Sequence, residues 1–256
     1  MELEQHLGSH FKSRLDIIEE EATKIWQKGE FHHIYYTLHG LEHSRQVIRI
    51  LEKLIEGLNP DDNVNETEVF CLLAAAYFHD VGMLCKYSND AERAAQKSAV
   101  KKKPYTVQDL IRDEHHIRSG RYIQEHAKDL TLDHVEVGCI RLIVEGHREK
   151  TLESDEYEDH VIGLESVRVR LLSALLRLAD ELDIDYKRAP DTLFDILKND
   201  MPDDSCLQWL KHYYTAGVPI NTVTEANRKR KTLIEIHCQY PKDEVGRKIT
   251  EVLIKI

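Results

Sequence analysis

Apolar residues recur at helical spacing through most of the chain. They return every three or four positions, which is typical of helices that bury one face against a core. Breaker residues such as Gly29 and Asn59-Pro60 separate the apolar segments. The pattern predicts helices over residues 15–29, 41–57, 69–76, 115–125, 135–144, 164–182, 191–198 and 205–214.

Two regions break this helical pattern. Residues 86–103 are mostly polar, and we expect a loop or a mobile lid there. Beyond Gly217, residues 232–238 and 250–256 are rich in β-branched residues and favour strands. The chain stops inside a predicted apolar strand. We expect this strand to be either a natural sheet edge or the cut end of a longer protein.

Together these elements predict a mainly α fold, a helical bundle with a small C-terminal β appendage. We expect three consecutive parts. Residues 1–30 form a helix that packs on the core, and residues 31–200 form the helical domain itself. Residues 201–256 form a helix and strands, which in a longer protein would begin a further domain.

The composition narrows the class of protein. Of 256 residues, 41% are hydrophobic and 32% are charged, so the chain can fill a core and disorder is disfavoured. No run of about 18 apolar residues occurs, and we expect no membrane-spanning helix and no membrane partner. The first ten residues lack the basic flank and apolar stretch of a signal peptide, so a cytoplasmic location is expected.

Charge and cysteine content exclude further classes. The chain has 35 Lys and Arg against 46 Asp and Glu, a net charge of −11, which disfavours nonspecific coating of nucleic acid. Two basic runs, at 101–103 and 228–231, could contact nucleic acid, which therefore remains a possible but less favoured partner. Five cysteines without a CxxC motif predict reduced thiols rather than disulfides.

Six of the residues that can bind metals occupy positions where a charged or polar group is costly. Asp180 interrupts an apolar helix, and a buried carboxylate needs a cation or an ion-pair partner. Taken singly, each of the six is better explained as a hydrogen-bonded or ion-paired core residue. Together they can converge, because helices packed side by side direct distant residues to one point. The six are His43, His79, Asp80, His116, His147 and Asp180.

Five segments carry a resemblance to a known family. They are Leu41-Glu42-His43-Ser44-Arg45-Gln46-Val47, Ala76-Tyr77-Phe78-His79-Asp80-Val81-Gly82, His115-His116-Ile117-Arg118-Ser119-Gly120, Ile143-Val144-Glu145-Gly146-His147 and Leu178-Ala179-Asp180-Glu181-Leu182-Asp183. Their order resembles the HD superfamily of metal-dependent phosphohydrolases, whose fold is all-helical. The wider pattern is similar to the HD-CE group of bacterial conflict systems. Its members can be joined to an ATPase of the Hsp90 type, which implies a fused or partner ATPase domain.

The resemblance implies a set of ligands. It implies His43, His79, Asp80 and Asp180 as ligands of one metal, and residues 31–200 as the HD-type domain. His116 and His147 resemble the additional ligands of two-metal members, in which Asp80 would bridge the two ions. One departure concerns the substrate. The HD-GYP phosphodiesterases carry Gly-Tyr-Pro shortly after the histidine that aligns with His147, whereas residues 148–152 are Arg-Glu-Lys-Thr-Leu, which weighs against cyclic di-GMP.

Such a site indicates hydrolysis of a phosphate ester or anhydride, with a nucleotide or cyclic nucleotide as the expected substrate. Imidazoles and carboxylates suit one or two divalent ions of Mn, Fe, Co, Ni or Zn, with Mg as a further choice. Such ions clamp phosphoryl oxygens and activate water. Beside the ligands, catalytic roles fall to Asp80, Glu114 and His115, and substrate contacts to His39, Arg118 and Arg148.

Three alternatives stay open at this stage. The chain can be a noncatalytic, nucleotide-sensing or regulatory module of a larger protein, which would use the same pocket without turnover. It can also be a metal-dependent nuclease, or a purely structural domain whose six residues hold no metal. The oligomeric state does not follow from the sequence.

Overall fold

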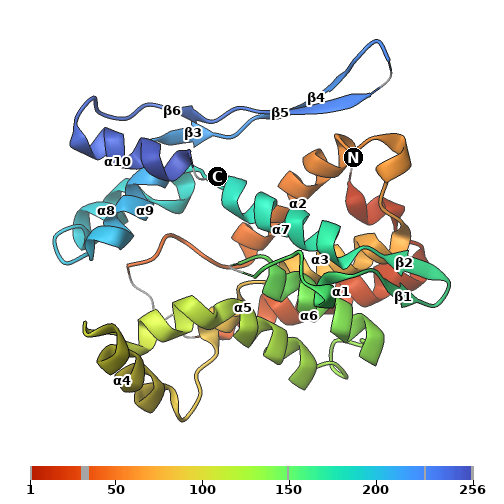
Figure 1. Cartoon of the computed structure of the whole chain (residues 1–256), viewed down its shortest axis with the longest axis horizontal. Coiled ribbons are helices and arrows are strands. Elements are labelled where there is room, and N and C mark those ends of the chain that lie inside the picture. The colour runs from red at the N-terminus through yellow and green to blue at the C-terminus, as the bar shows by residue number, and fades with distance from the viewer. Residues whose placement is uncertain (1, 30–34, 149, 228, 255–256) are drawn as a thin grey trace. The chain divides into compact units, whose positions relative to one another are not determined.

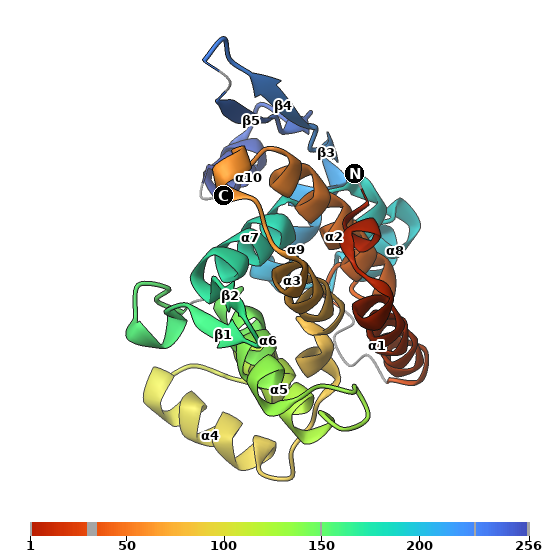
Figure 2. The same cartoon turned by 90° about the vertical axis from the view of Figure 1, so that its right-hand side faces the viewer.

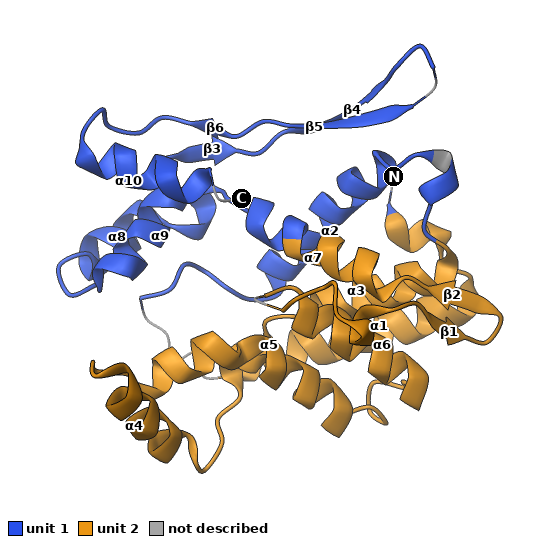
Figure 3. Cartoon of the chain, viewed as in Figure 1, with its two compact units in different colours: residues 1–2, 34–64, 178–256 blue, residues 3–33, 65–177 orange. Residues whose placement is uncertain are grey.

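A computed structural model describes residues 2–29, 35–148, 150–227 and 229–254 (Figure 1). The fold is mainly α, with short strands mostly near the C-terminus, as the sequence predicts. The chain divides into two compact units (Figure 3). Unit 1 comprises residues 1–2, 34–64 and 178–256, and unit 2 comprises residues 3–33 and 65–177. These units interleave along the chain, whereas the predicted parts are consecutive.

Unit 2 is built around one helix that is buried on all sides. Every residue of α3 (Glu66–Phe78) from Thr67 onward is buried, and α3 lies between α1 (Ser9–Lys28) and α6 (His134–Gly146) (Figure 2). This is why residues 69–76 are apolar nearly all round. The remaining elements of unit 2 are η1 (Leu3–His6), η3 (Val81–Leu84), α4 (Asp90–Lys101), α5 (Val107–Glu125), η4 (Asp155–Tyr157), β1 (His160–Ile162), β2 (Glu165–Val167) and the first part of α7 (Val169–Leu182).

Side-chain caps fix the starts of the central helices. The Asn65 side chain accepts a hydrogen bond from the backbone N–H of Glu68, and the Glu68 carboxylate accepts one from that of Asn65. Thr106 and Asp109 form the same reciprocal box at the start of α5. Such boxes satisfy N–H groups that have no partner inside the helix. Both helices carry histidines of the candidate site, His79 at the end of α3 and His115 and His116 within α5.

Unit 1 combines α2 (Leu41–Glu56) with a second small core. Trp209 is fully buried there beside Ala189 and Met201, and its indole N–H donates to the Tyr35 carbonyl over 2.9 Å. Two antiparallel strand pairs, β3–β6 and β4–β5, belong to the unit. Its other elements are η2 (Pro60–Asp62), the end of α7, η5 (Tyr186–Arg188), α8 (Asp191–Leu197), α9 (Asp203–Tyr213), β3 (Thr215–Gly217), β4 (Ile220–Thr224), β5 (Arg230–Ile234), β6 (His237–Cys238) and α10 (Glu244–Leu253).

Two predicted segments were wrong. The polar stretch 86–103 contains α4, because Ala94 packs against Tyr105 and Leu110 while the buried Asp90 binds Arg118. Residues 250–253 belong to α10 and not to a strand, since Ile249 is fully buried and the apolar residues from Val245 onward recur at helical spacing. Residues 255 and 256 lie outside the described part of the chain.

Two helix starts also differ from the prediction. The helix expected from residue 115 begins at Val107, where Thr106 caps it. The helix expected from Leu164 begins at Val169, because residues 160–167 form the β1–β2 hairpin. Leu164 is fully exposed beside Gly163, whose φ of +62° suits the turn. The strand predicted over residues 232–238 is confirmed in part, because β5 ends at Ile234 and β6 covers His237–Cys238.

The structure contains one helical stretch apolar enough to cross a membrane, among the described residues. It covers residues 66–84 and is 94% buried within the fold. The burial identifies it as the core helix of unit 2 together with the short turn that follows.

An ion pair at the start of α3 predicts that the stability of the fold depends on pH. Burial raises the pKa of the Glu68 carboxyl, but the hydrogen bonds from Arg168 and Asn65 outweigh it and the net pKa is lowered. The ion pair therefore contributes its full stability at pH values above 4.5, the ordinary pKa of a glutamate carboxyl. This contribution is lost as the pH falls through the lowered pKa of Glu68.

We expect Glu68→Gln to lower the free energy of unfolding by about 2–3 kcal/mol at pH 7, since Arg168 loses its charge partner and is itself partly exposed. Urea unfolding at pH 7 and pH 4 measures this. The difference between variant and wild type should shrink at pH 4, and the exposed Glu153→Gln should behave as wild type at both. A difference that is the same at both pH values would contradict the ion-pair explanation.

Candidate metal centre

The His-Asp pair lies where α3 ends and η3 begins. His79 is the residue that closes α3, and Asp80 precedes the first residue of η3. Both side chains are buried, with exposed fractions of 0% and 5%. A buried carboxylate next to a buried imidazole is costly without a cation or a proton. This turn is therefore the starting point of the candidate site in unit 2.

Three histidines of unit 2 are held by the same local hydrogen bond. Their Nδ1 atoms bond to the backbone carbonyl three residues earlier. His79 Nδ1 lies 2.9 Å from Ala76 O, His115 Nδ1 2.6 Å from Arg112 O, and His147 Nδ1 2.5 Å from Val144 O. A carbonyl can only accept, so each Nδ1 carries the proton and each Nε2 is left with a lone pair. This is the tautomer that binds a metal through Nε2.

The Nε2 atoms of these histidines converge on Asp80. His115 Nε2 lies 3.1 Å from His147 Nε2 and 3.3 Å from Asp80 Oδ1, and His79 Nε2 lies 3.4 Å from Asp80 Oδ2. Ligand atoms of Asp80, His115 and His147 all lie within 4.8 Å of one another. Nitrogen lone pairs facing each other and a carboxylate repel one another unless a cation lies among them. The spacing suits atoms that share an ion at about 2.0–2.2 Å, so the residues present fit a metal.

His116 lies beside this cluster on α5. Its ring centroid is 5.8 Å from that of His115 and 6.3 Å from that of His147. Its Nδ1 is buried without a hydrogen-bond partner in the described part of the chain. Burial, together with the electrostatic effects of the nearby His115, Arg148 and Lys150, lowers the pKa of His116 to about 4. The imidazole is therefore neutral at pH 7, as a metal ligand must be.

In unit 1, His43 lies between two carboxylates. Its Nδ1 is 2.6 Å from Asp183 Oδ2 and its Nε2 is 3.1 Å from Asp180 Oδ1. Arg188 donates to the Asp183 carboxylate over 3.2 Å, so the same Asp183 oxygen contacts both Arg188 and His43 Nδ1. His43 Nε2 thus faces Asp180. The prediction that His43, His79, Asp80 and Asp180 hold one ion draws on residues of both units and stays a prediction.

The other predicted residues have varied surroundings. The Glu114 carboxylate pairs with Arg93 over 2.8 Å and with Lys97 over 3.1 Å. Arg118 is 2% exposed and binds both carboxylate oxygens of Asp90, so its guanidinium holds α4 on α5. Their catalytic and substrate-binding roles stay predictions.

His39 and Arg148 lie nearer to candidate ligands. In unit 1, the His39 ring contacts that of His43 edge to face, with centroids 5.6 Å apart. In unit 2, Arg148 follows His147 directly and is half-buried. Its charge is close enough to lower the pKa of His116. Both substrate roles stay predictions, as does the catalytic role of His115, which the structure groups with Asp80 and His147 as a possible ligand.

Two residues of the site escaped the sequence reasoning. Arg177 donates to the carbonyls of Gly146, Arg148 and Lys150, so one guanidinium holds the loop that follows His147. Nothing in the sequence marks this contact. Asp183 had a signal, because it follows Asp180 by three residues and so lies on the same side of a helix end.

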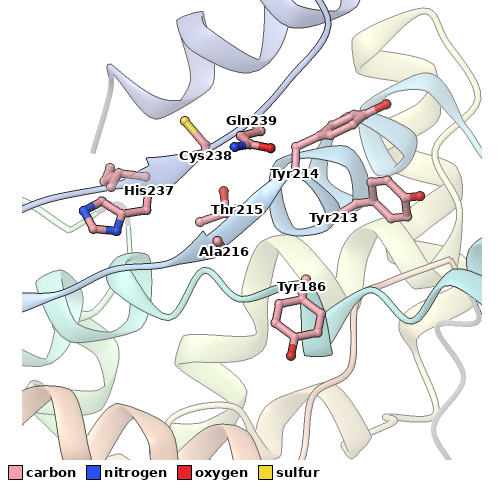
Figure 4. Close-up of a pocket in the computed structure, with 9 residues that line it drawn as sticks. Tyr186, Tyr213, Tyr214, Thr215, Ala216, His237, Cys238 and Gln239 are labelled. Carbon is pink, nitrogen blue, oxygen red and sulfur yellow. The ribbon is translucent and has the colours of Figure 1, made fainter.

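A cleft of about 730 Å³ opens in unit 1, at a different place. Tyr186, Tyr213 and Tyr214 line it together with residues of β3 and β6 (Figure 4). The residues that line it include none of the predicted ligands. The cleft is therefore not the candidate metal centre.

The comparison with family models agrees with the resemblance carried by the five segments. The model of the HD-CE family matches residues 33–253, which is most of the chain and includes every predicted ligand. Neither the curated proteins nor the solved structures give a match. The described ligand cluster of unit 2 and the extent of this match lead to one conclusion: the chain belongs to the HD-CE family.

Proposed function

We propose that this protein is a metal-dependent phosphohydrolase that cleaves a phosphate ester or anhydride bond of a nucleotide or cyclic nucleotide. One observation supports the proposal above all others: the Nε2 atoms of His115 and His147, 3.1 Å apart, both face the buried Asp80 carboxylate. Backbone carbonyls fix the tautomers that leave these lone pairs in place. This arrangement is unfavourable in an apolar core and favourable around a divalent cation.

Asp80 is suited to contact two ions. Its Oδ2 faces His79 and its Oδ1 faces His115, so its two oxygens point toward different imidazoles. Bound ions of Mn, Fe, Co, Ni or Zn, or of Mg, would supply Lewis acidity and a water of lowered pKa. In unit 2, Asp80, His79, His115 and His147 would hold them, with His116 as a further ligand. His43 and Asp180 are proposed to complete the set on the strength of the family resemblance.

The protein's own charges support an anionic substrate. Arg148 and Lys150 follow His147, and both contribute to the lowered pKa of His116, so their positive charges lie near the cluster. Arg177 fixes the carbonyls of this loop. We propose that Arg148 and Lys150 bind phosphate oxygens and orient the phosphoryl group. The ligands are buried, which strengthens their electrostatic interactions with an ion.

The setting of the protein is part of the proposal. We propose a cytoplasmic location, a phosphorylated small molecule as the main partner, and a fused or partner ATPase domain, as the HD-CE group implies. Nucleic acid is the less favoured substrate, given the net charge of −11.

Removing single ligands tests the centre. We expect the wild-type chain to bind one or two divalent ions and to release phosphate or nucleoside from a nucleotide panel. Asp80→Ala and His147→Ala should lower metal affinity by more than about 100-fold, beyond the effect of outer-shell changes, and reduce turnover to background. Elemental analysis and a phosphate-release assay measure this. The exposed His134→Ala, on the first residue of α6, serves as the matched control.

Each result has a distinct meaning for the proposal. Activity that survives both Asp80→Ala and His147→Ala would refute it. Tight nucleotide binding without turnover across several metals would instead identify a sensing or regulatory module. Cleavage of a single-stranded oligonucleotide, with no action on nucleotides, would identify a nuclease.

The buried His116 predicts an acid sensitivity of the metal-free fold. Its pKa is about 4 in the folded state against an ordinary value of 6.5, so between these values the unfolded chain binds more protons. Stability therefore rises with pH across this window and falls on acidification. We expect His116→Gln, which cannot be protonated, to flatten the slope of unfolding free energy between pH 4 and pH 6.5. Urea unfolding in chelator measures it, and an unchanged slope would show that His116 is already protonated in the fold.

A further inference from the structure

Helix α5 contacts the His79–Asp80 turn without any side chain between the two backbones. A Cβ atom built on Gly82 would lie 2.0 Å from the His115 carbonyl oxygen and 2.7 Å from the Ser119 backbone nitrogen. No other residue fits at position 82 unless α5 moves away. The backbone of α5 therefore packs directly on the turn that carries the His-Asp pair.

Ser119 ties the two together by hydrogen bonds. Its side chain is fully buried. The hydroxyl accepts from the Gly82 backbone N–H over 2.8 Å and donates to the His79 carbonyl over 2.7 Å. That carbonyl lies at the end of α3, where helices leave acceptors without partners inside the helix. One hydroxyl thus links α5 to the backbone on both sides of Asp80.

The position of Ser119 along α5 gives this link a consequence for the ligands. Ser119 lies four residues after His115, so both face the same side of the helix. His115 Nε2 lies 3.3 Å from Asp80 Oδ1. One helical turn later, Ser119 forms hydrogen bonds with the backbone on either side of Asp80. The separation of Asp80 and His115 therefore depends on the register between α5 and the turn, which Ser119 fixes.

We propose that Ser119 is a positioning residue, which sets the spacing of Asp80 and His115 for metal binding through its two hydrogen bonds to the His79–Gly82 turn. This inference rests on the proposed function, since it concerns the ligands of that same centre. It makes Ser119 more than a small residue that fills space between helices. A packing role would affect stability, whereas a positioning role also affects the ion.

The test is the affinity and absorption spectrum of Co²⁺ bound to the full chain. Ser119→Ala removes both hydrogen bonds, and we expect about 10- to 100-fold weaker binding with an altered Co²⁺ spectrum. Ser119→Thr keeps the hydroxyl and should bind within about threefold of wild type. Ser173→Ala is the matched control, because Ser173 is also fully buried in unit 2 but its hydroxyl has no hydrogen-bond partner in the described chain.

The outcomes separate this inference from the proposed function. A wild-type chain that binds no Co²⁺ and no other divalent ion would overturn both. A wild type that binds Co²⁺, with Ser119→Ala matching Ser173→Ala in affinity and spectrum, would overturn the positioning role alone. If Ser119→Ala does not fold, Ser119→Thr decides. Retained binding supports the role, and a tenfold or greater loss with the hydroxyl in place overturns it.

Discussion

The charge balance around Asp80 is the constraint on which the site in unit 2 depends. A carboxylate that is 5% exposed lies among imidazole nitrogens whose protons are committed to backbone carbonyls on the far side of each ring. Without a positive charge among these groups, burying the carboxylate charge beside the nitrogen lone pairs costs free energy. The buried residues around Asp80 could therefore hold a divalent cation. The helices of unit 2 provide the frame that keeps the donors together.

Local backbone geometry does much of this work. Each of the three histidines bonds to the carbonyl three residues before it, which is a contact available at the end or along the face of any helix. No distant side chain is needed to choose the tautomer. The loop after His147 is different, because Arg177 must reach across to hold three of its carbonyls. The ligands are thus fixed locally, while the cationic loop beside them depends on tertiary structure.

The sequence predicted the parts of the fold that have a strong period. The apolar α3, the helix that contains His43 and the helix that ends just before His147 were evident, since their apolar residues follow helical spacing. Helix α4 was missed because its surface is polar and Asp90 and Ala94 are its only buried residues. Helix α10 was mistaken for a strand because its β-branched residues favour strands locally, while the burial of Ile249 decides the outcome.

The candidate site shows the same division. The motif order pointed to His79, Asp80 and His147, but spacing alone does not decide which of two adjacent histidines faces a neighbouring turn. The structure brings His115 within 3.3 Å of Asp80, whereas His116 lies at the side of the cluster. Asp183 acts on its neighbours through contacts with His43 and Arg188, and Ser119 acts through hydrogen bonds with Gly82 and His79. Such contacts depend on helix register, which the apolar pattern of one sequence does not specify.

The complete burial of α3 has a consequence for how this protein can change over evolution. The helix is about 20 Å long, with the Glu68–Arg168 ion pair near its start and the His-Asp pair at its end. Because closely packed neighbours surround this helix, a larger or smaller side chain in its middle would make the helix slide or tilt. Such a movement would shift Asp80. We therefore expect the sequence of this inner helix to change very little over evolution.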